Sequence, residues 1–587
     1  MKNKIINLQN ITIQHLLIFN IFLYGLIFVT NSIIRFENPI FSCSFWMICD
    51  QTKIGWIDHA FLFQFLFSLA GFVTVIGIRF TTEYQKTSNH QKNYIWTIIL
   101  TVLIIANGVF WIFPGKFNNL LQIFLSVIIS INLTVWYVKV TNYDHEIKEK
   151  TKFESSLILL TASSLAMILF GVVISVTDFA RNCQQFPICF SSDGLIGQSI
   201  VVNTHRVLTL TTGIILLYVL NQTWKKFRNN SSLLVPITSG FIVFLGQSLI
   251  GWVQVTNNFE VNYLFIHSIG SYIYLLIIFY AASKVKYLVE DQKITNESFF
   301  NDHQRRKDYL ILNKPIIVAL LLVTTYAGMV VGGEEIPSLS LTIWTMIGGA
   351  LAAGGASAIN QYIDRDIDLS MQRTAKRPLP SKRLPPAEAL TIGVAEIILS
   401  FYIFTSFVNL NAALLAMAGM VYYVFLYSKW LKLITVQNIV IGGGAGAIPP
   451  LVGWAAATGG LNVPSLFLFA LVFLWTPPHF WALALIRKND YARANIPMMP
   501  VIKGEKETRL QILIYTIQLV LLTLLMPLFG VGGSIYFLLA ALLGMWLLYI
   551  AWKVYRNQGN KMAFRMYRYS SMYLAFIFLA LVVDVLM

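Results

Sequence analysis

Three oxygen-bearing side chains recur at four-residue intervals at the end of an apolar segment. They are Asn360, Asp364 and Asp368, in the stretch NQYIDRDIDLSMQRTAKRPLP, and we call them the ladder. If the apolar run 343–359 continues as a helix, this spacing places the three side chains on one face, about 6 Å apart. Mg²⁺ prefers one or two carboxylates and takes its other ligands from water and substrate phosphates. The ladder therefore predicts a Mg²⁺ site for a diphosphate substrate, at a wet membrane surface.

Basic residues follow the ladder within a turn or two. Arginine can hold a phosphate as a bidentate fork, and lysine as a point charge. The alternative is a solvated juxtamembrane helix of mixed charge. Asparagine and aspartate are poor helix formers, however, and carboxylates on one helix face repel each other unless a cation lies between them. We therefore expect Arg373, Lys376 and Arg377 to bind the same diphosphate.

The composition indicates which elements must position these residues. Of the 587 residues, 56% are apolar and 12% are charged, and the mean hydropathy is +0.66. Seventeen apolar runs of about 18 to 22 residues follow one another. The first, residues 11–33, lacks a small-residue cleavage site and is expected to be a retained span. The sequence thus predicts an all-α polytopic membrane protein.

A polar, charged stretch divides the apolar runs into eight and nine. We expect an eight-span domain at 1–290, a cytoplasmic linker at 291–314 and a nine-span domain at 315–587. The predicted fold is therefore an eight-helix domain, built as a duplicated four-helix bundle, followed by a nine-helix bundle.

The net charge of +16 is distributed as in a membrane protein and not as in a nucleic-acid-binding protein. If the N-terminus is cytoplasmic and the spans alternate, nearly all lysines and arginines fall at cytoplasmic ends, as the positive-inside rule requires. This orientation places the ladder in the cytoplasm and the C-terminus outside, and no nucleic acid is expected as a partner. The basic residues on the other side are Arg35, Lys53, Lys116, Arg181 and Arg206.

Two cysteine pairs with the same internal spacing indicate a repeat in the first domain. Cys43 and Cys49 lie in CSFWMIC, and Cys183 and Cys189 lie in CQQFPIC, 140 residues further on. Both loops are predicted on the non-cytoplasmic side, where a disulfide can persist. Each pair is expected to close a small loop, with four unpaired buried thiols as the alternative.

A histidine lies near the outer end of the span that follows each cysteine pair, at His59 and His205. A third, His267, lies near the outer end of the eighth span. A histidine inside a membrane is costly unless it is paired. The alternation of spans places His205 and His267 at equal depth, so two neighbouring helices can present imidazoles to both faces of one haem. For a single such histidine the alternative is a satisfied core residue.

Eight spans, a cysteine pair opening each half and histidines on even-numbered spans resemble the haem A synthase family, over residues 10–290. The resemblance implies oxidation of a methyl group of farnesylated haem, with the substrate haem in the first half and a haem b cofactor in the second. His59 matches the family's iron ligand on the second span, with Asp58 in place of the usual glutamate.

The fourth span, however, has no histidine where that family has another ligand. Either His59 alone holds the substrate haem, or this half does not oxidise haem. Three further histidines lie at the wrong depth: His15, His90 and His145.

A second predicted cytoplasmic loop runs through YSKWLKLITVQNIVIGGGAGAIPPLVGW. We expect Lys432 in this stretch to contact phosphate. The glycines permit close approach of either a ligand or a neighbouring helix, and Pro449 and Pro450 break a helix where a cavity can satisfy the freed carbonyls.

A third loop lies in LWTPPHFWALALIRKNDYARANIPMMP. His479 lies within the span, and Asp490 and Arg493 lie at its cytoplasmic end. The residue four positions after Asp490 is Ala494, so a second ladder is incomplete.

The pattern NxxxDxxxD with a trailing RTxxRPLP, together with NIVIGGGAGAIPPLVGWAA and WTPPHFWALAL, resembles the UbiA-type intramembrane prenyltransferases. The closest resemblance is to protohaem farnesyltransferases (haem O synthases), over residues 305–587. It implies that farnesyl diphosphate and haem b meet in a cavity. Mg²⁺ and basic residues would draw off the diphosphate, and a haem vinyl group would attack the allylic cation. At the place of the family's second aspartate-rich motif only Asp490 is available, which we expect to be catalytic, and Arg493 is expected to bind the diphosphate.

The sequence thus predicts a fusion of a haem A synthase-like domain with a haem O synthase, in a bacterial-type inner membrane. The expected cofactors are Mg²⁺ and haem b. The expected partners are farnesyl diphosphate, protohaem, haem O, the lipid bilayer and assembly factors of cytochrome oxidase. One alternative is that the N-terminal half only binds or delivers haem. A more distant one is a prenyltransferase for a quinone or another aromatic acceptor.

Overall fold

The computed structural model describes residues 15, 17–24, 116–142, 151–177, 179–181, 183–190, 196–290, 303–557 and 559–587. All regular elements within these ranges are helical. Thirteen helical segments of the described ranges are long and apolar enough to cross a membrane, and nine of these follow residue 303. The predicted all-α polytopic membrane fold is therefore confirmed. The chain divides into two compact units, Met1–Ile294 and Thr295–Met587.

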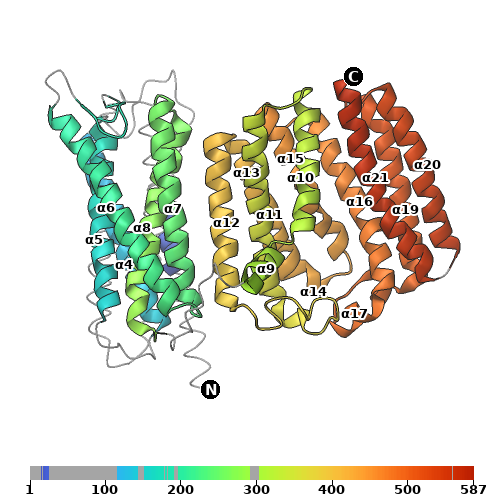
Figure 1. The fold of residues 1–587 in the computed structure, drawn as a ribbon, viewed down its shortest axis with the longest axis horizontal. Helices are drawn as coiled ribbons and strands as arrows, with labels where there is room; N and C mark the ends of the chain where they lie inside the picture. The colour runs from blue at the N-terminus through green and yellow to red at the C-terminus, as the bar shows by residue number, and fades with distance from the viewer. Residues whose placement is uncertain are drawn as a thin grey trace, which may run out of the picture. The chain divides into compact units, whose positions relative to one another are not determined.

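The described part of the first unit is a helical bundle (Figure 1). Its helices are α4 (Lys116–Thr141), α5 (Lys152–Thr177), α6 (Ile196–Lys226), α7 (Ser231–Thr256) and α8 (Val261–Lys284). Helix α5 packs on α6, α6 on α7, α7 on α8 and α8 on α5, which closes a ring of four. Helices α6 and α8 therefore lie diagonally across this ring.

Buried tyrosines of α8 find partners on the helices around it. The Tyr274 hydroxyl bonds the Ser164 hydroxyl of α5 at 2.8 Å, and Tyr272 donates to Ser130 of α4 at 2.6 Å. A buried hydroxyl without a partner would cost free energy, so these bonds help to set the rotation of α8 in the bundle.

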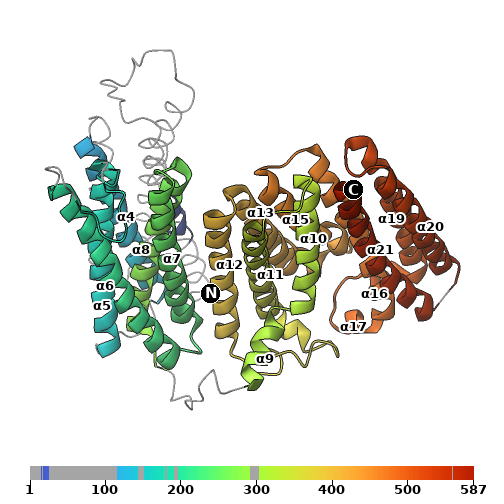
Figure 2. The same cartoon turned by 45° about the horizontal axis from the view of Figure 1, so that its top comes forward.

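The second unit begins with α9 (His303–Leu312), which lies at the same end of the long helices as α17 (Figures 1 and 2). The remaining helices are α10 (Pro315–Gly333), α11 (Leu339–Asp368), α12 (Pro386–Phe407), α13 (Leu410–Val421), a π-helical segment η2 (Tyr422–Leu431), α14 (Lys432–Ile434), α15 (Asn438–Thr458), α16 (Val463–Ile486), α17 (Lys488–Arg493), α18 (Met499–Ile502), α19 (Gly504–Leu525), α20 (Ser534–Arg556) and α21 (Asn560–Leu586). Helix α15 packs on α10, α13 and α16, and α16 also packs on α19 and α21. These two helices therefore form the middle of the unit.

Part of the stretch that we assigned to the linker belongs to the second unit. Helix α9 is fastened by Arg305 and Tyr309, which both donate to the fully buried Glu388 of α12. Its buried Asp308 accepts from Arg383 at 2.9 Å. Buried carboxylates need such partners, so this helix docks on the bundle and does not run free through solvent.

Helices α10 and α15 approach so closely that a methyl group does not fit between them. A Cβ at Gly453 would lie 1.8 Å from the Thr325 carbonyl oxygen, which is backbone and cannot turn aside. We expect Gly453→Ala to lower the free energy of unfolding by about 3 kcal/mol, at the upper end of what overpacking costs. Thermal unfolding in detergent measures this loss.

The matched control is Gly446→Ala on the same helix, where a Cβ would meet no atom within 4 Å. This variant should unfold at the wild-type temperature. Equal unfolding temperatures for the two variants would contradict the close approach of α10 and α15.

Candidate functional site

The ladder occupies the last turns of α11, which continues as a helix to Asp368 as predicted. Its side chains are not at a wet surface, however, because Asn360 is only 4% exposed and Asp364 and Asp368 are each 3% exposed. That expectation was wrong. The α9–α10 turn and the end of η2 lie against α11 and cover this face.

Each ladder side chain accepts a bond from a different basic side chain. The pairs are Lys314 Nζ with Asn360 Oδ1 at 3.0 Å, Lys432 Nζ with Asp364 Oδ2 at 2.6 Å, and Arg377 Nη1 with Asp368 Oδ2 at 2.7 Å. Two carboxylates thus lie among three cations. Such charges are stable away from water only when they are paired and hydrogen-bonded.

One oxygen of the ladder is left over. Asp364 Oδ1 is buried and has no hydrogen-bond partner in the part of the chain that the structure describes. Asn360 donates to the other oxygen, Oδ2, at 2.8 Å and to the Ser428 hydroxyl at 2.9 Å. An unpaired buried carboxylate oxygen is costly, and it is the kind of ligand that Mg²⁺ takes. The residues present therefore fit a Mg²⁺ ion.

Within the described ranges, no three His, Cys, Asp or Glu side chains converge on one point. The ladder offers two carboxylates and one amide oxygen. Mg²⁺ usually keeps several waters and binds substrate phosphates. A metal at the ladder would therefore need ligands that the protein does not supply.

Lys314 reaches the ladder from the turn between α9 and α10. Enclosure of its ammonium group lowers the pKa of Lys314 to about 7, and the charge of Arg377 acts in the same direction. The carboxylates of Asp364 and Asp368 oppose this effect. Sequence reasoning missed this residue because it lies in the predicted linker, where a lysine fits the positive-inside rule. The sequence feature that could have identified Lys314 was its position directly before Pro315, at the start of a span.

The π-helical segment η2 is a second feature that sequence reasoning missed. Its wider turns are seen at its end, where the Lys432 backbone N–H donates to the Tyr427 carbonyl, five residues back. The segment places Ser428 on Asn360 and ends at Leu431, directly before Lys432, which pairs with Asp364. Short π-helical stretches often occur at functional sites. Here the irregular helix supplies two side chains to the ladder.

The other basic residues predicted for the diphosphate lie farther out. Arg373 and Lys376 are both exposed. Arg373 lies close enough to Tyr427 and Tyr491 to interact with them electrostatically. The Lys376 side chain points to solvent, while its carbonyl accepts from Arg383 at 3.2 Å.

Asp490 lies on α17 and is buried, with 6% of the residue exposed. It accepts from Arg493 and lies 3.7 Å from Arg487. Among the described residues, Asp490 belongs to no group of three or more His, Cys, Asp or Glu side chains. Its neighbour Tyr491 interacts with Arg373, which connects the two motifs electrostatically.

The glycines of α15 and the histidine of α16 serve mainly in packing. A Cβ at Gly442, Gly443 or Gly444 would collide with a side chain of a neighbouring helix, whereas Gly446 faces open space. His479 bonds the Ser570 hydroxyl at 2.9 Å and stacks on Trp475. A histidine held in this way is a satisfied core residue.

A separate candidate site lies in the first unit, where α6 carries His205 and α8 carries His267. The helices are diagonal in the ring of four, so the expectation of neighbouring helices was wrong. The two imidazoles lie within electrostatic range of each other. A glycine faces each ring. A Cβ added at Gly171 would lie 3.0 Å from the His205 ring, and one added at Gly251 would lie 3.4 Å from the His267 ring.

The two rings differ in their hydrogen bonds. His205 Nδ1 bonds the Met167 carbonyl at 2.9 Å. The His267 ring interacts with the backbone of Gln247, and its Nδ1 is buried without a hydrogen bond of normal geometry in the described part of the chain. Such an unpaired nitrogen calls for a ligand or a functional explanation. His59, Asp58, Cys43 and Cys49 lie outside the described residues.

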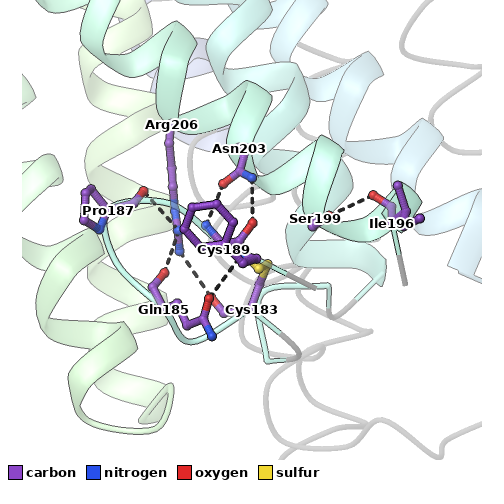
Figure 3. Close-up of a disulfide and its surroundings, with 9 residues drawn as sticks. Cys183, Gln185, Pro187, Cys189, Ile196, Ser199, Asn203 and Arg206 are labelled. Carbon is purple, nitrogen blue, oxygen red and sulfur yellow. Dashed lines mark hydrogen bonds between the residues drawn. A yellow bond between two sulfur atoms is a disulfide. The ribbon is translucent and has the colours of Figure 1, made fainter. Parts of the chain in front are cut away.

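A disulfide loop lies against α6 at Asn203 and Arg206, which stand on either side of His205 in the sequence (Figure 3). Cys183 and Cys189 are bonded, with their Cα atoms 5.5 Å apart. Arg206 donates to the carbonyls of Gln185 at 2.7 Å and of Cys183 at 3.2 Å, and Asn203 makes two 2.9 Å bonds to the backbone of Cys189. The loop is thus fastened to α6 on both sides of the histidine, which gives Arg206 a structural role on the predicted outer side.

Comparison with known proteins gives the following matches. Residues 321–579 match the UbiA prenyltransferase family. A protoheme IX farnesyltransferase of Symbiobacterium thermophilum is 50% identical over 281 residues, which cover 48% of this chain and 94% of that protein. One of Roseiflexus sp. (strain RS-1) is 52% identical over 278 residues, or 47% of this chain and 52% of that protein.

The chain therefore spans about half the length of the first curated relatives that it matches. Among solved structures, a UbiA homolog from Archaeoglobus fulgidus bound to DMAPP and Mg²⁺ is 16% identical. It has a TM-score of 0.37 and covers 47% of this chain and 99% of that chain.

Proposed function

Because the chain belongs to the UbiA prenyltransferase family, we propose that it transfers a farnesyl group from farnesyl diphosphate to a vinyl group of protohaem, making haem O. The observation that carries this proposal is the buried ladder, whose two carboxylates and one amide lie among three cations. The relatives named protoheme IX farnesyltransferase support protohaem as the acceptor.

In this proposal Asn360, Asp364 and Asp368 hold Mg²⁺, which supplies charge neutralisation to the departing diphosphate. The free oxygen of Asp364 supports this role, because it has no hydrogen-bond partner among the described residues. Lys432 and Arg377 pair with these carboxylates and lie where each could bind a phosphate oxygen of a diphosphate held at the ladder.

The chain's own cations hold the leaving group. Arg377 can bind the diphosphate as a fork and Lys432 as a point charge. Both side chains already point at the ladder, so little reorganisation is needed when negative charge develops on the diphosphate. We propose that Arg373, Lys376 and Arg493 guide the diphosphate from the cytoplasmic side, and that Asp490 holds Arg493 in place.

The reaction breaks the C1–O bond of the farnesyl diphosphate and forms a carbon–carbon bond to the vinyl group. The electron pair of the broken bond leaves with the diphosphate. Water adds to the cation that remains on the acceptor and loses a proton, which leaves the hydroxyl group of haem O. The apolar helices around the ladder keep water from the allylic carbon until the vinyl group reacts.

Haem pigments extracted from cells test this function directly. In a host that lacks its own haem O synthase, expression of the full chain should produce haem O, identified by its mass and retention time. The Asp364→Asn variant should not produce it. A prenylated quinone in the absence of haem O would favour the aromatic-acceptor alternative and overturn the assignment of protohaem.

We further propose that the first unit binds a haem between His205 and His267. Two diagonal helices can place imidazoles on opposite faces of one haem, and the unpaired Nδ1 of His267 supports this placement. Two roles for the first unit follow from such a site. It either oxidises haem O to haem A, with haem b as the cofactor, or it only binds and delivers haem. The lack of a histidine on the fourth span favours the second. Haem A in the extracted pigments would favour the first.

A further inference from the structure

We infer that Lys314 is a substrate-binding residue for the prenyl diphosphate, outside the motifs that the sequence revealed; this inference rests on the proposed function. Lys314 Nζ donates to Asn360 Oδ1 at 3.0 Å. Three basic side chains, those of Lys314, Lys432 and Arg377, thus each donate to a different side chain of the ladder.

The position of Lys314 depends on a turn that several side chains hold in place. The Ser357 hydroxyl donates to the Leu312 carbonyl at 2.7 Å, and the Gln361 amide donates to the same carbonyl at 2.7 Å. Gln361 also donates to the Ile311 carbonyl at 3.2 Å. Both donors lie on α11, next to Asn360. The helix that carries the ladder therefore also holds the turn that carries Lys314.

A second helix holds the turn from the other side. Asn313 donates to Glu396 of α12 at 2.7 Å, and Gly354 leaves room for this pair, since a Cβ there would lie 3.1 Å from the Asn313 amide. Lys314 itself has φ of +46°, in the left-handed region that side chains other than glycine disfavour. Glycine adopts this conformation without strain, so glycine would suffice if this position were needed only to form a turn. The surrounding bonds hold a lysine in this conformation, with its ammonium group on the ladder.

Metal binding at the ladder would release Lys314 toward the substrate. Its present acceptor, Asn360 Oδ1, is the oxygen that Asn360 would offer to Mg²⁺, and an ammonium group and a metal cannot both occupy it. The ammonium group has three donors, so once displaced it needs a new acceptor. Lys432 and Arg377 are already matched in number by the two carboxylates, so no carboxylate of the ladder is left to balance a charge on Lys314. A bound diphosphate would supply that negative charge.

Binding of inorganic pyrophosphate to the purified full chain tests this inference. Calorimetric titration in the presence of Mg²⁺ should show that Lys314→Met weakens binding on the order of tenfold, which is the loss of one charge-assisted bond. Lys314→Arg, which keeps the charge, should stay within about threefold of wild type by the same reasoning. In the transfer reaction, Lys314→Met should raise the KM for farnesyl diphosphate and leave the KM for protohaem unchanged.

Lys429→Met is the matched control, because Lys429 lies in the same region but is exposed. It should bind pyrophosphate like the wild type. If Lys314→Met does not fold, Lys314→Gln keeps a donor for Asn360 without the charge and should show the same loss. Wild-type affinity in a folded neutral variant would overturn the role of Lys314 alone. Failure of the folded wild-type protein to bind pyrophosphate would overturn the proposed function, and this inference with it.

Discussion

Replacing Asp364 with asparagine is expected to lower the rate of haem O formation by about a hundredfold to a thousandfold, as the loss of one preorganised electrostatic group commonly does. The carboxylate supplies the free buried oxygen of the ladder and pairs with Lys432 at 2.6 Å. Asparagine has the same shape without the charge. Asp364→Asn therefore tests the charge alone. Asp364→Ala would leave Lys432 unpaired and would also create a cavity. The rate is measured as haem O formed from protohaem and farnesyl diphosphate by the purified chain.

Asp366→Asn is the control for this experiment. Asp366 lies on the same helix between two ladder residues, but its side chain is 81% exposed. We expect near-normal haem O formation from this variant and a large loss from Asp368→Asn. The unfolding temperature of each variant separates loss of chemistry from loss of fold. A folded Asp364→Asn protein with wild-type activity would show that the ladder is not the diphosphate site.

The second large effect is expected in the first unit. His205→Ala or His267→Ala should each remove a low-spin haem spectrum from the purified full chain, because ligation by two imidazoles needs both. The two side chains come from diagonal helices, and neither ring can replace the other across the bundle. The visible spectrum of the reduced protein, recorded at equal protein concentration, measures the loss.

His303→Ala serves as the control, because His303 is exposed and lies on α9 of the second unit. Its spectrum should equal that of the wild type. A low-spin spectrum that persists in both His205→Ala and His267→Ala would place the haem ligands elsewhere in the chain.

The candidate diphosphate site could be predicted as far as it depends on local geometry. A spacing of four residues puts side chains on one helix face wherever the helix lies. Asn360, Asp364 and Asp368 could therefore be grouped from the sequence, and α11 extends through all three. Arg377 lies nine residues from its partner Asp368, close enough to be found by reading along the chain.

The pairs that join distant parts of the chain could not be assigned in this way. Lys314 is 46 residues from Asn360, and Lys432 is 68 residues from Asp364. Lys432 could be named as a phosphate ligand because it lies in a distinctive stretch, but its partner could not. Lys314 lies in a polar stretch that reads as a linker. Only the packing of the α9–α10 turn on α11 brings it to the ladder.

The sequence by itself determined the membrane-spanning helices, because the bilayer demands long apolar segments and helices satisfy their backbone hydrogen bonds internally. It also determined which polar residues share a face. The tertiary structure alone decided that the ladder is buried among three cations, and that His205 and His267 lie on diagonal helices. Burial and pairing depend on which helices pack together and at what rotation. That choice is made by many weak contacts between residues far apart in the chain, and no short pattern records them.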